Sequence, residues 1–327
     1  MNTRRIAFTV AKICFAAAVI AWLLHKVDAS RVWNCVRNAR GGPVLLGILM
    51  GQLTVVVAGW RWRRLLAIFE IRARLRSLIC VAQIGQFFMM FLPGPAGDDL
   101  TRMLYISRLA KGRAGEACTS VVIDRFMGLT SILVFAAFGI PGQWHLLVAS
   151  RPTYWLALGM LGACGVAGAL GIAYFLSSEQ GARRFFAVVL RLFPGARLHD
   201  EIERMTGLLW ANKGSIVQVI IAAAGTQFLL CASYYLAGVA VGIHATPWVW
   251  FSFVPIVNAA NAFPISVAGI GVREYLLVLF LGVLAHAASE TALAASILVL
   301  GMTVVVCLMG GVVYIFYRPK QGTTIVV

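Results

Sequence analysis

Residues 91–102, FLPGPAGDDLTR, place proline, glycine and charge in the middle of an apolar region of the chain. An apolar helix candidate, residues 78–92, runs into this motif with no polar linker in between. In a soluble protein the motif would be a surface turn, but its surroundings here are apolar enough to lie within a membrane. Broken backbone at membrane depth is tolerated only where protein buries it or where it lines a wet cavity. The motif therefore predicts a helix that is interrupted inside the membrane.

A second motif of the same kind, FPISVAGIGVR, covers residues 263–273. In the first motif Arg102 follows Pro93 by nine positions, and in the second an arginine follows the proline at the same spacing. Glycine permits the turns and close packing that an interrupted helix needs. The residues expected to form the backbone of the two hairpins are Pro93, Gly94, Gly97, Pro264, Gly269 and Gly271.

The composition of the 327-residue chain is typical of a membrane protein: 61% of the residues are hydrophobic, 12% are charged, and the mean hydropathy is +0.87. A soluble domain carries about twice this share of charge. The net charge of +16 is compatible with nucleic-acid binding, but the Lys and Arg residues flank apolar spans, which indicates membrane topology and attraction to anionic headgroups. We therefore expect an anionic phospholipid as partner and no nucleic acid. The cysteines and histidines show no metal-ligand spacing, so neither a metal nor another cofactor is predicted.

The apolar segments predict an all-α, polytopic helical membrane protein with a single integral membrane domain over residues 1–327. The first segment is longer than a signal-peptide core of about 7–15 residues, so an uncleaved span is expected there. Two Pro/Gly-broken re-entrant hairpins are expected in addition to about six full spans. These spans are residues 6–24, 43–60, 117–140, 153–176, 214–237 and 291–317.

Loop charge predicts the orientation of the spans. Six arginines between residues 61 and 76 indicate the cytoplasmic side, whereas the sparsely charged loops 141–152 and 238–246 suit the outside. Both termini are then cytoplasmic. The first hairpin enters and leaves on the cytoplasmic side, and the second is expected to enter from the outside.

The chain shows an internal repeat when it is shifted so that Pro93 falls on Pro264. The apolar spans on either side of the first motif then fall on those on either side of the second. The two repeats, about residues 43–140 and 214–311, each consist of a span, a hairpin and a span. Because loop charge gives them opposite orientations, we expect an inverted-topology repeat, an architecture that recurs in secondary transporters.

Three motifs carry a resemblance to a known family. The first motif is similar to the family's segment of Pro, Gly-Asp and Arg. DRFMG, at residues 124–128, is similar to its Asp-Arg-x-x-Gly motif. Residues 263–274 match the family pattern best of the three. The family is that of the flippase-like transmembrane proteins grouped with the membrane region of lysylphosphatidylglycerol synthases, the UPF0104-like inner-membrane proteins. The resemblance covers most of the chain, and it implies movement of a lipid or lipid-linked substrate across the bacterial inner membrane.

Two departures from the family pattern limit what the resemblance implies. The family has an asparagine three residues before the proline, where the first motif has Met90 and the second keeps Asn261. The soluble aminoacyl-transferring domain of the synthases has no counterpart in these residues, so synthase activity is not expected.

Nine polar residues in or beside the apolar segments form the predicted substrate site. Arg102 and Arg273 come just after the helix breaks, where a planar guanidinium facing a cavity would bind a phosphate. The alternative is that each snorkels, or pairs with a carboxylate and locks its hairpin. The predicted set is Arg102, Arg273, Arg125, Asp124, Glu274, Asp98, Asp99, Asn258 and Asn261.

Asp124 and Arg125 are adjacent in an apolar span, and adjacent helical positions do not face each other, so each needs its own partner. We expect Asp124 to pair with Arg102 or Arg273. Arg125 would reach a lipid phosphate, and it is also the expected partner of Glu274.

The other acidic and amide residues allow two interpretations each. Asp98, with Asp99 beside it, either pairs with Arg102 four residues later on one helix face or caps the start of that helix. Asn258 and Asn261 share a helix face and would bind a headgroup or form interhelical hydrogen bonds.

These features favour a lipid flippase or transporter that moves an anionic, phosphate-bearing lipid or lipid-linked substrate by alternating exposure of a midplane cavity. No Walker motif is found, so ATP hydrolysis is not expected. The first alternative is a membrane-embedded enzyme that acts on lipid headgroups, but no acid–base spacing supports it, and the protein is not expected to be an enzyme. The second alternative is a non-transporting scaffold subunit with purely structural buried charges.

Overall fold

The computed structural model describes residues 29–90, 96–110, 113–176, 208–262 and 271–317. The regular elements in these ranges are all α-helices, which confirms the predicted all-α class. They are α2 (Ala29–Arg37), α3 (Gly41–Ile68), α4 (Leu75–Met89), α5 (Ala96–Leu109), α6 (Ala114–Gly142), α7 (Trp144–Leu147), α8 (Arg151–Leu176), α11 (Lys213–Ala240), α12 (Pro247–Ala262), α13 (Val272–Leu284) and α14 (Ser289–Phe316).

Four helices are long and apolar enough to cross a membrane: α3, α6, α11 and α14. They cover four of the expected spans, and α8 covers a fifth, residues 153–176. The expected first span, residues 6–24, lies outside the described residues. The protein is therefore a polytopic helical membrane protein, as the sequence predicts.

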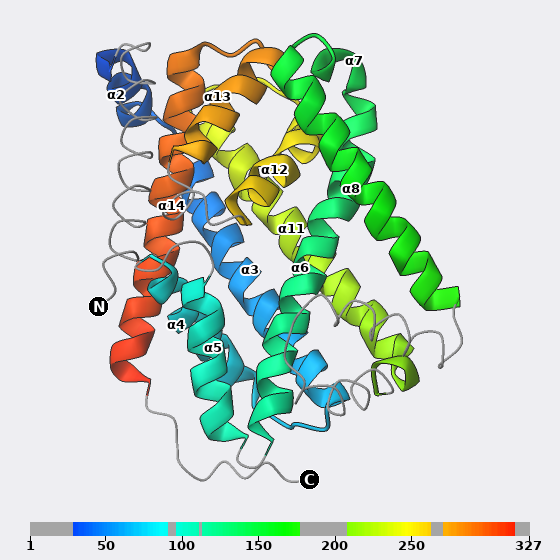
Figure 1. Cartoon of the computed structure of the whole chain (residues 1–327). Coiled ribbons are helices and arrows are strands. Elements are labelled where there is room, and N and C mark those ends of the chain that lie inside the picture. Colours follow the sequence, from blue (N-terminus) through cyan, green and yellow to red (C-terminus); the bar gives the residue numbers. More distant parts are fainter. Residues whose placement is uncertain (1–28, 91–95, 111–112, 177–207, 263–270, 318–327) are drawn as a thin grey trace, which may run out of the picture.

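Two pairs of shorter helices lie at opposite ends of the bundle. α4 and α5, of 15 and 14 residues, lie at the end where α3 finishes and α6 begins (Figure 1). α12 and α13, of 16 and 13 residues, lie at the end where α11 finishes and α14 begins. At 1.5 Å per residue, none of the four reaches the ~30 Å thickness of a bilayer core. Each predicted break thus falls between two short helices, although residues 91–95 and 263–270 themselves lie outside the described ranges.

The long helices run in opposite directions in the two halves of the chain. In Figure 1, α3 descends and α6 ascends, whereas α11 ascends and α14 descends. α3 packs along α11, and each short pair is braced by a long helix of the other half, because α4 packs on α14 and α12 packs on α6. The two halves are therefore held together by reciprocal contacts.

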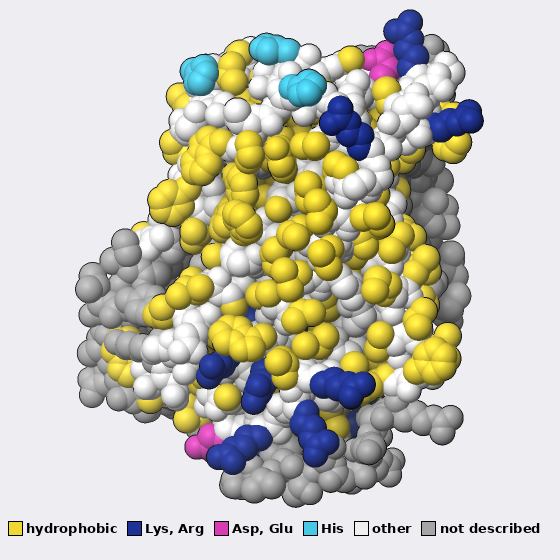
Figure 2. Space-filling model, turned by 180° about the vertical axis from the view of Figure 1, so that it is seen from behind, with side chains coloured by type: hydrophobic (Ala, Val, Ile, Leu, Met, Phe, Trp, Pro, Cys, Tyr) yellow, Lys and Arg dark blue, Asp and Glu magenta, His cyan; other side chains and the backbone are white. Residues whose placement is uncertain are grey.

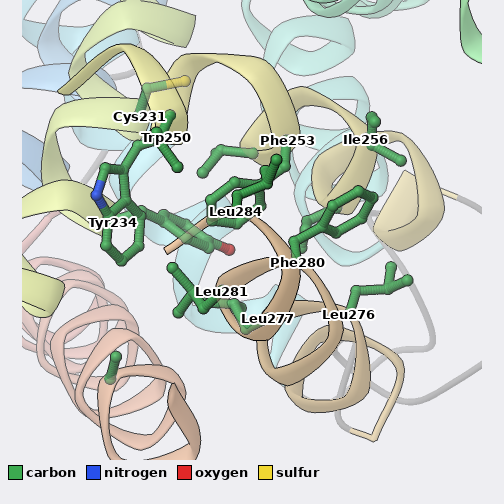
Figure 3. Close-up of a cluster of buried hydrophobic side chains, with 14 of the residues drawn as sticks. Cys231, Tyr234, Trp250, Phe253, Ile256, Leu276, Leu277, Phe280, Leu281 and Leu284 are labelled. Carbon is green, nitrogen blue, oxygen red and sulfur yellow. The ribbon is translucent and has the colours of Figure 1, made fainter. Parts of the chain in front are cut away.

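A buried aromatic core fixes the position of α12 and α13. Trp250 and Phe253 of α12 pack with Phe280 of α13, and the last two rings stack with their centroids 5.4 Å apart (Figure 3). Cys231 and Tyr234 of α11 border the same cluster. Because the three aromatic side chains are fully buried, this core holds α13 against α12, which in turn packs on α11.

The surface matches the membrane environment predicted from composition. Figure 2 shows a broad band of apolar side chains, with Lys and Arg gathered at its lower edge, a smaller basic group at its upper edge, and histidines at the upper end. An apolar band between polar rims is what a bilayer requires of a spanning protein.

The sequence-based boundaries were wrong in three places. The segment between the first two expected spans, 6–24 and 43–60, contains α2, whose Val32 is buried against α14. The span expected to end at residue 60 continues as α3 to Ile68, because apolar residues keep a helical spacing among the arginines. The loop expected at residues 141–152 contains the short helix α7.

Gly310 of α14 lies at a close contact with α4. A Cβ at this position would lie 2.0 Å from the backbone oxygen of Gln83, whereas a Cβ at Gly301 on the same helix would meet nothing within 4 Å. Backbone cannot move aside as a flexible side chain can, so Gly310→Ala is expected to lower the free energy of unfolding by about 1–3 kcal/mol. Thermal unfolding in detergent measures this effect. Gly301→Ala is the matched control, and equal melting temperatures for the two variants would contradict the close contact.

Candidate functional site

A cavity of about 410 Å³ lies inside the bundle, lined by residues of α3, α4, α5, α6, α11, α12, α13 and α14. Eight of the nine predicted site residues line it, and the ninth, Glu274, is buried beside it. The lining members of the predicted set are Asp98, Asp99, Arg102, Asp124, Arg125, Asn258, Asn261 and Arg273. Residues from motifs more than 100 positions apart in the chain therefore meet at one place.

Asp124 of α6 is the centre of a buried ion-pair network. Its Oδ1 accepts a hydrogen bond from Arg61 Nε at 2.7 Å, and its Oδ2 accepts one from Arg61 Nη2 at 2.9 Å. Arg102 Nη1 donates to the same Oδ2 at 3.0 Å. The predicted pairing of Asp124 with Arg102 is therefore confirmed, and the carboxylate joins α3, α5 and α6.

Asp98 pairs with Arg102 rather than capping the helix. α5 begins at Ala96, so Asp98 lies within its first turn, and its Oδ1 accepts a hydrogen bond from Arg102 Nε at 2.8 Å. The guanidinium also lies over the ring of Trp62, 5.5 Å from the ring centroid. Arg102 thus contacts two carboxylates and an aromatic face, and this places it firmly within the network.

Sequence reasoning missed Arg61. Its place in an arginine-rich segment suggested a cytoplasmic loop, yet it is buried in α3, 7% exposed, and lines the cavity. The periodicity of the segment contained the signal, because Arg61, Leu65 and Ile68 share one buried helix face while Arg63 and Arg64 are exposed.

Glu274 does not pair with Arg125, and that prediction was wrong. Its Oε1 accepts hydrogen bonds from Arg273 Nη2 at 2.6 Å and Nε at 3.1 Å. Its Oε2 accepts the backbone N–H of Gly271, which has a φ of 92° and precedes the first residue of α13. Glycine is favoured at that φ. Because the glutamate side chain folds back to bond the N–H at the start of α13, its carboxylate lies beside Arg273.

Arg125 is the most weakly paired arginine of the cavity. Among the described residues, Arg125 forms an ion pair only with Asp99. The distance from Arg125 Nε to Asp99 Oδ2 is 3.7 Å, which is longer than a hydrogen bond. Both side chains are about one-third exposed, whereas the other arginine side chains of the cavity are 8% exposed or less. The positive charge of Arg125 is therefore the one most open to a ligand.

Two asparagines present unsatisfied polar atoms to the cavity. Asn258 Nδ2 and Asn261 Oδ1, both of α12, are buried and have no hydrogen-bond partner among the described residues. Buried polar atoms are normally hydrogen-bonded, so this pair of a donor and an acceptor indicates a place for a polar ligand or water.

The hairpin residues that the structure describes support close packing at the breaks. A Cβ on Gly97 would lie 2.4 Å from the backbone oxygen of Phe88, so glycine lets α5 approach α4. Gly271 has the positive φ noted above. The other four predicted hairpin residues, Pro93, Gly94, Pro264 and Gly269, lie outside the described ranges.

Charge in and beside the cavity is balanced. Four arginines and three aspartates line it, and Glu274 behind Arg273 makes the numbers equal. A site with fixed charges of both signs can hold a polar, charged group within a membrane, which an apolar cavity cannot do. The described lining includes no histidine, cysteine or lysine.

Fold and site together define a multi-pass helical membrane protein with a charged internal cavity. The chain belongs to the lysylphosphatidylglycerol synthase TM region family, whose model matches residues 9–311. Membership of this family assigns the protein a lipid-related function, in agreement with the resemblance seen in the motifs.

Two curated relatives match parts of the chain. A UPF0104 membrane protein of Methanocaldococcus jannaschii is 22% identical over 139 residues, which cover 42% of this chain and 40% of the relative. The glycosyltransferase AglD of Haloferax volcanii is 24% identical over 346 aligned positions, which cover 95% of this chain and 54% of the relative. The chain thus spans about half the length or less of these curated relatives.

Proposed function

We propose that this protein is a lipid flippase or transporter that moves a phosphate-bearing lipid, or a lipid-linked substrate, across the bacterial inner membrane. The headgroup occupies the cavity between the two short helix pairs. The observation that carries the proposal is the convergence of eight predicted binding residues on one cavity with a weakly paired arginine. No covalent chemistry is needed for this function.

The arrangement of charge supports a phosphate as the anionic part of the substrate. Arg102 is held by Asp98 and Asp124, so its charge is already compensated, whereas Arg125 can leave its distant partner for a phosphate oxygen. Asn258 Nδ2 and Asn261 Oδ1, which have no hydrogen-bond partner among the described residues, then bind polar atoms of the headgroup.

The proposed mechanism is alternating access in an inverted repeat. The opposite directions of the long helices and the reciprocal bracing of the short pairs support two inverted units, residues 43–140 and 214–311. Rocking one unit against the other would expose the cavity to each membrane face in turn. The absence of a Walker motif in the sequence favours an ion gradient, or no energy source, over ATP.

Reconstitution into liposomes tests the proposed function. The full chain is expected to speed the movement of a fluorescent anionic phospholipid between leaflets, measured by dithionite quenching, and to move a zwitterionic analogue more slowly. The double variant Asn258→Ala, Asn261→Ala should slow movement by roughly tenfold, because it removes headgroup hydrogen bonds worth about 1 kcal/mol or more. Asn38→Ala is the control, since Asn38 is exposed and lies outside the cavity.

The outcomes of this assay separate the candidate functions. Lipid movement no faster than in empty liposomes would contradict the flippase. Recovery of a covalently altered lipid would favour the membrane-embedded headgroup enzyme instead. That alternative is supported by one relative, which is named as a glycosyltransferase.

The orientation of the protein can be tested separately. We expect an impermeant maleimide added outside intact cells to label Ala149→Cys but not Arg74→Cys on a cysteine-free background. Both positions are exposed, and they lie in loops at opposite ends of the bundle, the arginine-rich end facing the cytoplasm. The converse labelling pattern would invert the proposed topology.

A further inference from the structure

The cavity reaches the protein surface at Asp99 of α5 and Arg125 of α6. These side chains are 28% and 32% exposed, whereas those of the other charged residues in the network are 12% exposed or less. Both residues line the cavity and face each other across two neighbouring helices. They therefore mark a mouth of the cavity between α5 and α6.

This mouth is bordered by apolar side chains. Leu100 and Leu104 of α5 are 49% and 57% exposed, and Val122 and Phe126 of α6 are 43% and 53% exposed. Each pair is spaced by four residues, so each forms one outward stripe along its helix. Exposed apolar stripes on a membrane protein contact acyl chains, which indicates that the mouth opens sideways into lipid.

The mouth also lies deep in the membrane. Asp99 precedes the end of α5 at Leu109 by ten residues, and Arg125 follows the start of α6 at Ala114 by eleven. At 1.5 Å per residue, both lie about 15–17 Å from the connection between the helices, which is close to half the thickness of a bilayer core. A partly exposed ion pair at this depth is unfavourable unless a polar group meets it from outside.

We propose that α5 and α6 form a lateral portal through which a phospholipid headgroup passes between the bilayer and the cavity. Arg125 exchanges Asp99 for the lipid phosphate as the headgroup enters, while the acyl chains stay outside along the apolar stripes. The substrate is therefore a membrane-resident lipid and not a water-soluble molecule. This inference rests on the proposed function, because it takes the cavity as the headgroup site.

Photolabelling of the full chain in proteoliposomes tests the portal. The probe is a phospholipid with a diazirine on its headgroup, and adducts are located by mass spectrometry. We expect adducts at Leu100 and Phe126, and we expect Arg125→Leu to reduce both these adducts and those inside the cavity, at Met89 and Leu230, by roughly tenfold. Val166 is the control position, because it is exposed near the middle of α8 but does not line the cavity.

The labelling pattern separates failure of the portal from failure of the proposed function. Adducts at Met89 and Leu230 without adducts at Leu100 and Phe126 would overturn the portal and leave the headgroup site standing. No adduct at any cavity residue would overturn both. Headgroup labelling of Val166 as strong as that of Phe126 would show that headgroups reach this depth anywhere, and it would also overturn the portal. A probe with the diazirine in its acyl chain should label Phe126 and Val166 alike.

Discussion

Replacing Asp124 with alanine is expected to lower the free energy of unfolding by about 3–5 kcal/mol, because removing one member of a buried ion pair leaves its partners uncompensated. Two guanidinium groups would lose their shared carboxylate, since Arg61 and Arg102 both donate to Asp124. The side chains of Arg61 and Asp124 are only 8% and 5% exposed, so the lost contacts are buried ones. Thermal or denaturant unfolding of the purified protein in detergent measures the change.

Asp99→Ala is the matched control for this prediction. It removes the same side chain from a pair whose atoms lie 3.7 Å apart, beyond hydrogen-bond distance, and only one arginine loses a partner, so a smaller change is expected. Asp124→Asn keeps the shape of the side chain and should fall between the two. If Asp124→Ala proves no less stable than Asp99→Ala, the network does not hold α3, α5 and α6 together.

Much of the helix arrangement was predictable from sequence, because membrane-spanning helices are long and apolar and their breaks are marked by proline and glycine. The two Pro/Gly motifs correctly marked where α4 gives way to α5 and α12 to α13. A charge within the membrane is costly, so each charged residue inside an apolar segment indicates a site by its position in the sequence alone. Arg102, Asp124 and Arg273 could be selected on that ground, and the cavity brings them together.

The pairing of these charges could not be predicted, because it depends on helix ends and packing. Arg61 lies among arginines that resemble a topology signal, and only its inward position on α3 makes it a partner of Asp124. Glu274 pairs with Arg273 because α13 starts at Val272 and the glutamate folds back to that start. Sequence spacing indicates which residues share a helix face, and it contains no information on how two long side chains bend toward each other.

The four arginines of the cavity differ in how they are paired. Arg61 and Arg102 are held by short contacts to carboxylates and stabilise the helix bundle around the cavity. Arg125 is the weakly paired one among the described residues, and its side chain is 32% exposed. Arg273 is intermediate, because both of its bonds to the glutamate end on one oxygen, Glu274 Oε1. This geometry orients the guanidinium of Arg273 on the cavity wall without surrounding it by carboxylates.

Arg273→Lys is therefore expected to slow lipid movement by roughly ten- to hundredfold while the protein stays folded. A guanidinium can hold Glu274 and a phosphate at the same time through different nitrogens, whereas the single ammonium of lysine serves one of them well. Losing one charge-assisted hydrogen bond would raise the free-energy barrier to transport by about 1.5–3 kcal/mol, which corresponds to the expected ten- to hundredfold slower lipid movement. The dithionite assay measures the rate, and the melting temperature in detergent reports the folded state.

Two further variants make the result for Arg273 decisive. Arg74→Lys is the control for the substitution itself, because Arg74 is exposed and remote from the cavity, and it should move lipid at the wild-type rate. Arg273→Ala should abolish movement and also destabilise the protein, because it leaves Glu274 buried without its cation. If Arg273→Lys transports normally and Arg273→Ala fails only through loss of folded protein, the arginine locks its hairpin. The phosphate would then be bound elsewhere in the cavity, with Arg125 as its remaining ligand.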